Sequence, residues 1–477
     1  MGKIRGVIVD AESGEKVEAK VQVMSPSGRM LMPPGSLEKR GPGAPFFYCD
    51  GEFEVESPRG QADVTVERGT EYTPFHSAVQ VDKQGTKDLR IELKRWADLP
   101  AEGWYPGNTH IHYDEKETRP YDRLAYDAKV ETYNVTAVSI LERWDLDYAS
   151  NKFPLGVMTD YSTAHHVVDV GEENRHNDAA GKFAYGHVMF LRIRNMVEPV
   201  SRGFLVDNFN PDYPPLCFAC DEARDQGGIV IWCHNGQGME APVAAVLGKL
   251  DGFNLFDPFW MDPEYDIWYK MMNCGLHLPA STGTDWFVCS NNRVYVQMDE
   301  AFSYDNWLDG MKKGRTFITN GPALFLEVGD EAPGGTVELT GEKKVKVKVR
   351  WSSHYPLNKI GLIQNGELVE GKKFEAGTHD GAWETDLTVA SDGWIAARAS
   401  GEARDSFNQA IYAHTSPVYV KNGRVDASRS ACASYFLDSI DQSVDWLDNV
   451  GRFNGDEQRD NVKELFLKGR KAFEKLV

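Results

Sequence analysis

The sequence predicts a multidomain protein that combines α/β and all-β parts: a distorted (β/α) barrel flanked by two β-sandwiches, with a pair of helices at the C-terminus. Three patterns lead to this fold class. Short β-branched runs separated by turn residues fill residues 1–95 and again 323–421, apolar runs alternate with helical stretches over residues 96–322, and amphipathic helices occupy residues 422–477. A length of 477 residues also exceeds that of one ordinary domain.

The first segment, residues 1–95, has the pattern of an all-β domain. Turn residues such as Ser25-Pro26-Ser27-Gly28 separate its alternating runs, which cover residues 4–9, 19–24, 52–56, 61–67, 76–81 and 89–93. The segment resembles a carboxypeptidase regulatory-like β-sandwich in four places: Gly6-Val7-Ile8-Val9-Asp10, Ala19-Lys20-Val21, Asp50-Gly51-Glu52-Phe53 and Val66-Glu67-Arg68-Gly69. We therefore expect a β-sandwich here.

The central segment, residues 96–322, changes character. Apolar runs at residues 135–141, 187–193 and 228–232 alternate with helical stretches, two of which are predicted over residues 122–133 and 221–226. This alternation is typical of a barrel or of an open parallel sheet.

The last third of the chain returns to strands and ends in helices. Strand runs lie at residues 343–351, 360–364 and 393–399, with turns at Pro333-Gly334-Gly335 and Asn365-Gly366, so residues 323–421 are expected to form a second, separate β-sandwich. Helices are predicted near residues 430–449 and 456–476. In the second helix, the apolar residues recur at helical spacing: Val462, Leu465, Phe466, Phe473 and Leu476.

Composition excludes several classes of partner. The formal net charge is −20 and the acidic residues are spread along the chain, which argues against a nucleic-acid or anionic-membrane surface. No stretch reaches transmembrane length. Seven cysteines show no disulfide framework, and the single Cys217-x-x-Cys220 lacks the second pair that a zinc ribbon needs. Residues 1–10 resemble a first strand and not a signal peptide. The compartment stays open, cytoplasmic or, if a signal was removed, secreted or periplasmic.

The strongest chemical signal is the pair His110 and His112 in Gly107-Asn108-Thr109-His110-Ile111-His112. Residues two apart on a strand face the same side, so both imidazoles can reach one metal ion. Further polar residues stand at or beside later apolar runs: Glu142, Glu172, Glu173, His187, His234 and Asp285. Barrel enzymes carry catalytic groups at the ends of several different strands, and His, Glu and Asp are ligands for zinc, manganese and iron.

In this ordered set, residues 96–322 resemble the PHP (polymerase and histidinol phosphatase) superfamily of metallohydrolases, and most closely its CehA/McbA-like branch. The opening histidine motif, Gly171-Glu172-Glu173 followed by Gly186-His187, the isolated His234, Gly283-Thr284-Asp285 and the tail at residues 314–322 carry the likeness. The resemblance implies a PHP-like barrel with two divalent metal ions (Zn, Mn or Fe). It assigns the first ion to His110, His112, Glu173 and Asp285. The second ion shares Glu173 as a bridge and adds His187 and His234.

Two departures from the family pattern agree with each other. Where relatives often carry histidines for a third metal, this chain has Arg143 and Phe287, so the resemblance implies a site for two metals. Arg143 either binds an anionic part of the substrate or the developing oxyanion, as a catalytic and substrate-binding group, or pairs with Asp145 or Asp147. The sequence leaves both open.

The bridging ligand and the substrate contacts are the remaining assignments. Neighbours on a strand point to opposite faces, so only one of Glu172 and Glu173 can bridge the metals; the family spacing favours Glu173. His176, expected on a loop between Glu173 and His187, and Trp286, next to Asp285, are candidate substrate contacts.

The expected activity is hydrolysis of an ester, carbamate, amide or phosphoester bond by a hydroxide that bridges two metal ions, because metal coordination brings the pKa of water to about 7. Glu173 and Arg143 are the predicted catalytic residues, and the substrate is expected to be a small or saccharide-like molecule. The competing hypothesis is a carbohydrate-binding or scaffold protein with a degenerate metal site. The sequence gives no oligomeric state.

Overall fold

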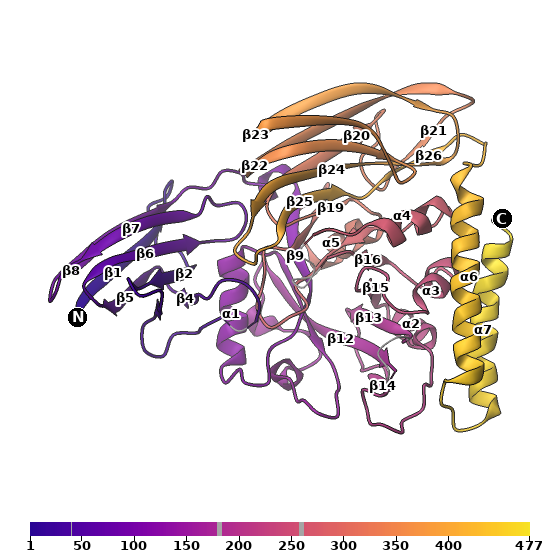
Figure 1. Ribbon diagram of the computed structural model, residues 1–477, viewed down its shortest axis with the longest axis horizontal. Coiled ribbons are helices and arrows are strands. Elements are labelled where there is room, and N and C mark those ends of the chain that lie inside the picture. The colour runs from indigo at the N-terminus through magenta and orange to yellow at the C-terminus, as the bar shows by residue number, and fades with distance from the viewer. Residues whose placement is uncertain (40, 179–183, 257–261) are drawn as a thin grey trace.

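The computed structural model describes residues 1–39, 41–178, 184–256 and 262–477. It is a mixed α/β protein in which a strand-rich N-terminal part and a C-terminal helix pair lie at opposite ends of the long axis (Figure 1). Within the described chain, none of the helices has both the length and the apolar character needed to span a bilayer. The seven cysteines are all buried.

Two small sheets form the N-terminal part. Antiparallel and parallel pairing gives the order β5 (Glu52–Ser57), β1 (Gly2–Asp10), β8 (Thr86–Leu93) in one sheet. The other has the order β3 (Met30–Leu31), β2 (Ala19–Met24), β6 (Gly60–Glu67), β7 (Phe75–Val81), with β4 (Phe47–Cys49) also on β2. Alternate residues of β6 are buried, as the period of a half-covered strand requires. Both sheets contribute to one apolar core that contains Ile4, Val21 and Val64.

The central domain is built on a curled sheet. Its strands pair in the order β9 (Trp104–Ile111), β10 (Val135–Ile140), β12 (Val167–Asn177), β13 (Gly186–Leu191), β15 (Ile229–Cys233), β16 (Gly252–Asn254), β17 (Ala280–Ser281). A bridge between Ile111 and Asp285 then connects the chain after β17 back to β9. The ends of the strands are thereby brought round to face one another. Short strands β11 (Gly156–Val157) and β14 (Ser201–Gly203) add to β12, and β18 (Arg293–Gln297) pairs with β9.

The strand directions depart from a purely parallel alternation. Pairs β9–β10–β12 and β15–β16–β17 are parallel, but β12–β13 and β13–β15 are antiparallel. The physical reason is length: only residues 178–185 connect β12 to β13, and a parallel crossover takes about a dozen residues or more. The helices of this domain are α1 (Pro120–Glu131), α2 (Leu216–Asp225), α3 (Ala241–Val246), α4 (Asp266–Asn273) and α5 (Tyr304–Lys312).

The second β-rich segment has its own core but is not separate from the central sheet. Its strands are β20 (Ala323–Val328), β21 (Thr336–Glu338), β22 (Lys343–Gln364), β23 (Glu367–Val389), β24 (Gly393–Arg404), β25 (Ala410–Thr415) and β26 (Val418–Lys421), around a core that includes Val347 and Leu362. Strand β19 (Thr316–Thr319), which pairs with β18, also pairs with β25. The expectation of a separate sandwich is corrected here: the edge of β19 satisfies its backbone groups by pairing with a strand from the next segment.

The two C-terminal helices are α6 (Ser428–Asn449) and α7 (Asp456–Glu474). They lie side by side along one side of the central domain and contact α3 and α4 (Figure 1). Their apolar faces, including Phe436, Trp446 and Phe466, belong to the same buried core as β13 and β15. The helix pair is therefore an integral part of the central domain and forms one of its walls.

Candidate metal centre

Six predicted ligands come together at one end of the curled sheet. His110 lies near the end of β9 and His112 just beyond it, Glu173 is in β12, His187 is in β13, His234 follows β15, and Asp285 follows β17. Their donor atoms form two overlapping groups that could hold metal ions, namely His110, His112, Glu173 and Asp285, and Glu173, His187 and His234. Because β9, β12 and β15 end at the same edge, residues far apart in sequence meet there.

The first group surrounds one oxygen of Glu173. The Nε2 atoms of His110 and His112 lie 3.0 Å apart. His112 Nε2 is 2.9 Å from Glu173 Oε2, and His110 Nε2 is 3.7 Å from it. Asp285 Oδ1 lies 3.3 Å from His110 Nε2 and 3.5 Å from His112 Nε2. Two carboxylates and two imidazoles thus converge on one point.

The second group surrounds the other oxygen of the same carboxylate. Glu173 Oε1 lies 2.9 Å from His187 Nδ1 and 3.6 Å from His234 Nε2. These two imidazole nitrogens are 3.2 Å apart. The carboxylate of Glu173 therefore directs one oxygen to each group, which is the arrangement of a bridging ligand.

The far nitrogens of two imidazoles fix which nitrogen faces the cluster. His112 Nδ1 lies 2.9 Å from the backbone carbonyl of Ser139, which can only accept, so Nδ1 carries the proton and Nε2 presents a lone pair. His187 Nε2 lies 2.8 Å from Asn177 Oδ1 in the same way, which leaves the Nδ1 lone pair facing Glu173. Ligating histidines in metalloproteins are oriented by partners of this kind.

The protonation of the cluster also suits a cation. Burial and the nearby Arg175 lower the pKa of His187 to about 4, so its imidazole is neutral at pH 7. Burial by itself raises the pKa of Glu173, but Arg175 and the neighbouring histidines outweigh it and hold that pKa well below the usual carboxyl value. Glu173 is therefore an anion although its side chain is only 2% exposed.

The cluster lacks a partner that a cation would supply. Glu173 Oε1 is buried and accepts no hydrogen bond of good geometry within the described chain. A buried charged oxygen without a hydrogen bond is costly. A divalent cation between Oε1 and the lone pairs of His187 and His234 would satisfy all three, so the residues present fit the metal ions that the sequence implies.

Asp285 is held in an uncommon backbone conformation. Its φ is 56°, in the left-handed region that residues other than glycine seldom occupy. Backbone hydrogen bonds on both sides fix it there: its N–H donates to the His110 carbonyl at 2.7 Å, and its own carbonyl accepts from His112 N–H at 3.0 Å. Strain of this kind at a cluster of polar side chains is characteristic of functional sites.

The neighbouring Glu172 lies on the opposite face of β12. It accepts hydrogen bonds from Asn174 Nδ2 and from the backbone N–H of Val197. Burial raises the pKa of Glu172 to about 7. The structure thus places Glu173, and not Glu172, between the two groups.

Arg143 forms the ion pair that the sequence leaves as its alternative. Its Nε and Nη2 donate to the two carboxylate oxygens of Asp145, at 2.9 and 2.8 Å. The guanidinium that lies against the cluster is instead Arg175, whose Nε is 3.5 Å from Glu173 Oε1 and has no hydrogen-bond partner in the described chain.

His176 has to be corrected as a substrate contact. It lies on β12 and not on a loop, its side chain is fully buried, and both ring nitrogens are occupied. Tyr185 N–H donates to Nδ1 at 2.8 Å, so Nε2 carries the proton and donates to Asp212 Oδ1 at 2.8 Å. The alternation of β12 explains the error, because a residue three positions after Glu173 points to the other face.

Trp286 lies among aromatic side chains on the His112 side of the cluster. Its ring contacts Phe287 edge to face, with centroids 4.8 Å apart, and Phe287 in turn stacks on Tyr148 at 5.7 Å. Tyr148 lies 6.0 Å from the His112 ring. Trp286 is thus part of an aromatic wall, and its role as a substrate contact stays a prediction.

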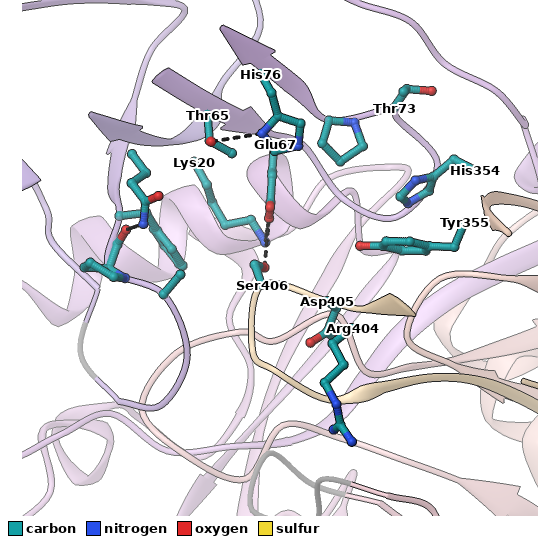
Figure 2. Close-up of a pocket in the computed structure, with 15 residues that line it drawn as sticks. Lys20, Thr65, Glu67, Thr73, His76, His354, Tyr355, Arg404, Asp405 and Ser406 are labelled. Carbon is teal, nitrogen blue, oxygen red and sulfur yellow. Dashed lines mark hydrogen bonds and ion pairs between the residues drawn. The ribbon is translucent and has the colours of Figure 1, made fainter. Parts of the chain in front are cut away.

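A cavity of about 520 Å³ opens on the second group and contains His187 and His234 in its wall. His110 and His234 also line a space of about 10 Å³, enough for a single water molecule. Another cavity, of about 440 Å³, lies between the N-terminal sheets and the second β-rich segment (Figure 2). Its lining includes Lys20 and Tyr355 and none of the six predicted ligands. The larger cavity therefore gives access to the candidate metal centre on its His187 side.

Sequence reasoning missed three groups that complete the centre: Arg175, Asn177 and the carbonyl of Ser139. Two of them carry a signal that could have been used. Arg175 and Asn177 follow Glu173 at intervals of two along β12, so they face the same side of the sheet. Ser139 acts through its backbone, which no side-chain pattern reports.

Comparisons with known proteins do not assign a family or a function to this chain. No protein-family model matches the chain. No curated protein matches it either. Among solved structures, GBS52, the minor pilin of the Gram-positive pathogen Streptococcus agalactiae, is similar over 20% of this chain and 45% of its own, with 15% identity and a TM-score of 0.16. A likeness of that extent carries no argument about fold or function.

Proposed function

We propose that this protein is a metal-dependent hydrolase of the PHP type, CehA/McbA-like, with two divalent ions at the candidate metal centre. The observation that carries the proposal is the position of Glu173, whose Oε2 faces His110 and His112 while its Oε1 faces His187 and His234. The facing imidazole nitrogens are 3.0 Å apart in the first group and 3.2 Å apart in the second, and His112 and His187 each direct a lone pair into their group.

Each predicted ligand is assigned to one of the two ions or, for Glu173, to both. His110, His112 and Asp285 would hold one ion, His187 and His234 the other, and Glu173 both. When bound, Zn, Mn or Fe at these positions would supply activation of water at neutral pH and polarisation of the bond under attack. Arg175 adds a positive charge beside Glu173, where it also favours negative charge that develops on the substrate.

The donor set is complete, which supports an enzyme over a saccharide-binding scaffold with a degenerate site. A scaffold is under no constraint to keep six ligands facing one another with their outer hydrogen bonds. The bond type, whether ester, carbamate, amide or phosphoester, is left to experiment because the ligands serve all four chemistries.

The test is elemental analysis of the purified protein followed by a hydrolysis screen. We expect about two transition-metal ions per chain, by the ligand count. We also expect turnover of at least one of 4-nitrophenyl acetate, 1-naphthyl methylcarbamate, a 4-nitroanilide or bis(4-nitrophenyl) phosphate. His110→Ala and His234→Ala should each lower the metal content.

His165→Ala is the matched control, because His165 is an exposed loop histidine. Full metal occupancy in the double variant His110→Ala/His234→Ala would reject the site. Stoichiometric metal without hydrolysis of any substrate would favour the scaffold.

A further inference from the structure

The wall of the cavity opposite His187 and His234 comes from the C-terminal helix α6. The cavity of about 520 Å³ is lined from β12, β13 and the segment after β15, and from α6 by Ser439, Gln442 and Ser443. These three positions are spaced three and four apart, so they form one stripe on the helix surface. Helix α6, which follows all six predicted ligands in the sequence, therefore faces the side of the candidate metal centre that carries His187 and His234.

The described lining mixes polar and apolar groups and includes neither lysine, arginine, aspartate nor glutamate. Its polar side chains other than histidine are amides and hydroxyls: Asn177, Gln237, Ser439, Gln442 and Ser443. Ser443 Oγ donates its proton to the Ser439 carbonyl at 2.9 Å, so it offers the cavity an acceptor. Amides supply both donors and acceptors. Such a wall suits neutral groups that both donate and accept hydrogen bonds.

In the metal-free protein, the described lining offers an anion no counter-charge, because it includes neither lysine nor arginine. Helix α6 adds none: of its four aspartates, Asp441 pairs with Arg470 and Asp448 with Lys463, both on α7. A carboxylate placed in the metal-free cavity would therefore lose hydration without gaining an ion pair from this described lining.

Helix α6 is fixed to the same strand that carries Glu173. His176, on β12, donates to Asp212 Oδ1, and Asp212 exchanges hydrogen bonds with Arg452 just after α6: Asp212 N–H to the Arg452 carbonyl and Arg452 N–H to Asp212 Oδ2, each 2.8 Å. Trp446 of α6 also contacts the rings of His176 and Tyr185, with centroids 6.2 and 6.3 Å away. The position of the polar stripe is thereby set relative to the metal ligands.

From these contacts we infer that α6 forms the substrate-recognition wall of the centre and that it selects a neutral, polyhydroxylated group, of the kind that a carbohydrate or another polyol presents. The inference rests on the proposed function, since it names the substrate class of that same site. Ser439 and Gln442 are its specificity-determining residues, and His176 is a positioning residue that acts through Asp212 on the end of α6.

The test compares two probes of the same shape in the full-length protein. Methyl α-D-glucopyranoside and methyl α-D-glucuronopyranoside differ in a hydroxymethyl against a carboxylate. Binding is measured by saturation-transfer NMR, with and without chelator. In the chelated protein we expect a roughly tenfold or greater preference for the neutral glycoside, because a desolvated carboxylate without a counter-charge is poorly tolerated.

Two variants locate the preference in α6. Gln442→Lys, at an exposed position of the helix, should admit the uronate, a gain that a structural role would not produce. Ser439→Trp should fill the cavity and exclude both probes. Gln80→Lys, an equal charge change at an exposed position of β7, should change neither affinity. Circular dichroism checks that each variant is folded.

Equal binding of both probes, binding of neither, or an unchanged preference in Gln442→Lys would overturn the inference. Metal content and hydrolysis are scored separately. A neutral-selective cavity in a protein without metal would reject the hydrolase and keep the recognition wall as a binding site. Hydrolysis with a cavity indifferent to charge would do the reverse.

Discussion

Two of the buried clusters of ionisable side chains in this protein, the interface cluster and the candidate metal centre, differ in whether their charges match. In the interface cluster, between the N-terminal sheets and the central domain, Glu131 lies 2.7 Å from Lys20 Nζ and 3.1 Å from Arg293 Nη2. All three side chains are at most 2% exposed. Glu67 lies 3.7 Å from Lys20 and accepts from Ser406, as Figure 2 shows. Each carboxylate faces a cation of the chain itself.

In the candidate metal centre, the chain supplies lone pairs in excess. Two carboxylates and four imidazoles converge, and Arg175 is the cation that lies against them. The interface cluster is thus explained by folding alone, as a fixed contact between two parts of the chain. The candidate metal centre could hold a further partner that accepts electron pairs, such as the proposed metal ions. A buried cluster whose donors and acceptors do not match is therefore the better indicator of function.

The largest effect is expected at the bridge. Glu173→Gln keeps the size of the side chain and removes the charge that faces both groups. We expect the loss of at least one metal ion and a fall in hydrolysis of roughly 10³-fold or more, because each cation contributes several kcal/mol to the transition state. Metal analysis and kcat/KM measure both.

The control for the bridge is its neighbour. Glu172→Gln removes a carboxylate whose partners are Asn174 and Val197 on the opposite face of β12, and should keep both metals. If Glu172→Gln lost metal while Glu173→Gln kept it, the assignment of the faces would be reversed.

The interface cluster should respond in stability and not in metal content. Glu131→Ala leaves Lys20 and Arg293 buried without their counter-charge, which costs about 3–5 kcal/mol of the free energy of unfolding. Urea unfolding should show the loss while metal analysis stays at the wild-type value. Glu52→Ala, which breaks the exposed pair with Lys16, should leave the unfolding midpoint where it is. Metal loss in Glu131→Ala would mean that the two clusters are coupled.

A smaller effect is expected from the outer partner of His187. Asn177→Ala removes the oxygen that holds the imidazole through Nε2 and sets Nδ1 toward Glu173. Partners of this kind typically contribute 10–100-fold to metal affinity. Competition with a chromophoric chelator measures this change. Asn195→Ala, an exposed asparagine, serves as the control, and equal affinity in the two variants would remove Asn177 from the centre.

The sequence predicts the parts of this arrangement that side-chain types and strand periods report. His110 and His112 share a strand face, and their four partners stand beside apolar runs, but Glu142 and Glu172 do so as well. The resemblance to the PHP superfamily is what singles out the six. The alternation of side chains along β12 places Glu172 and His176 on the face opposite Glu173. His176 was nevertheless predicted on a loop, because β12 extends beyond its apolar run. The end of β12 is set by its pairing with β13 and β14, and the sequence around His176 carries no information about that pairing.

Long-range contacts were also beyond the sequence. The pairing of β19 with β25 connects the central sheet to the second β-rich segment, and the attachment of α6 depends on Asp212 and Arg452, which lie 240 residues apart. Nothing in the amphipathic pattern of α6 indicates that its polar stripe faces a cavity. A hydrophobic period defines the buried face of a helix but not what lies against the other face.

The smallest effect is expected at Arg143, where the comparison of matched and unmatched charges makes a definite prediction. Its guanidinium donates to both carboxylate oxygens of Asp145, and the two side chains are 29% and 33% exposed. The charges of this pair match, as they do in the interface cluster and unlike those of the candidate metal centre. Partly exposed pairs contribute about 0–1 kcal/mol, and a side chain already paired offers little to a substrate anion. We therefore expect Arg143→Ala to keep both metals and to lower kcat/KM by roughly fivefold at most, since 1 kcal/mol is about fivefold in rate.

The paired variant Asp145→Ala sharpens the test, because it removes the partner of the Arg143 guanidinium while keeping the guanidinium itself. Should Arg143→Ala cost more than tenfold while Asp145→Ala raises the rate on an anionic ester, Arg143 would return to the mechanism as a group that Asp145 restrains.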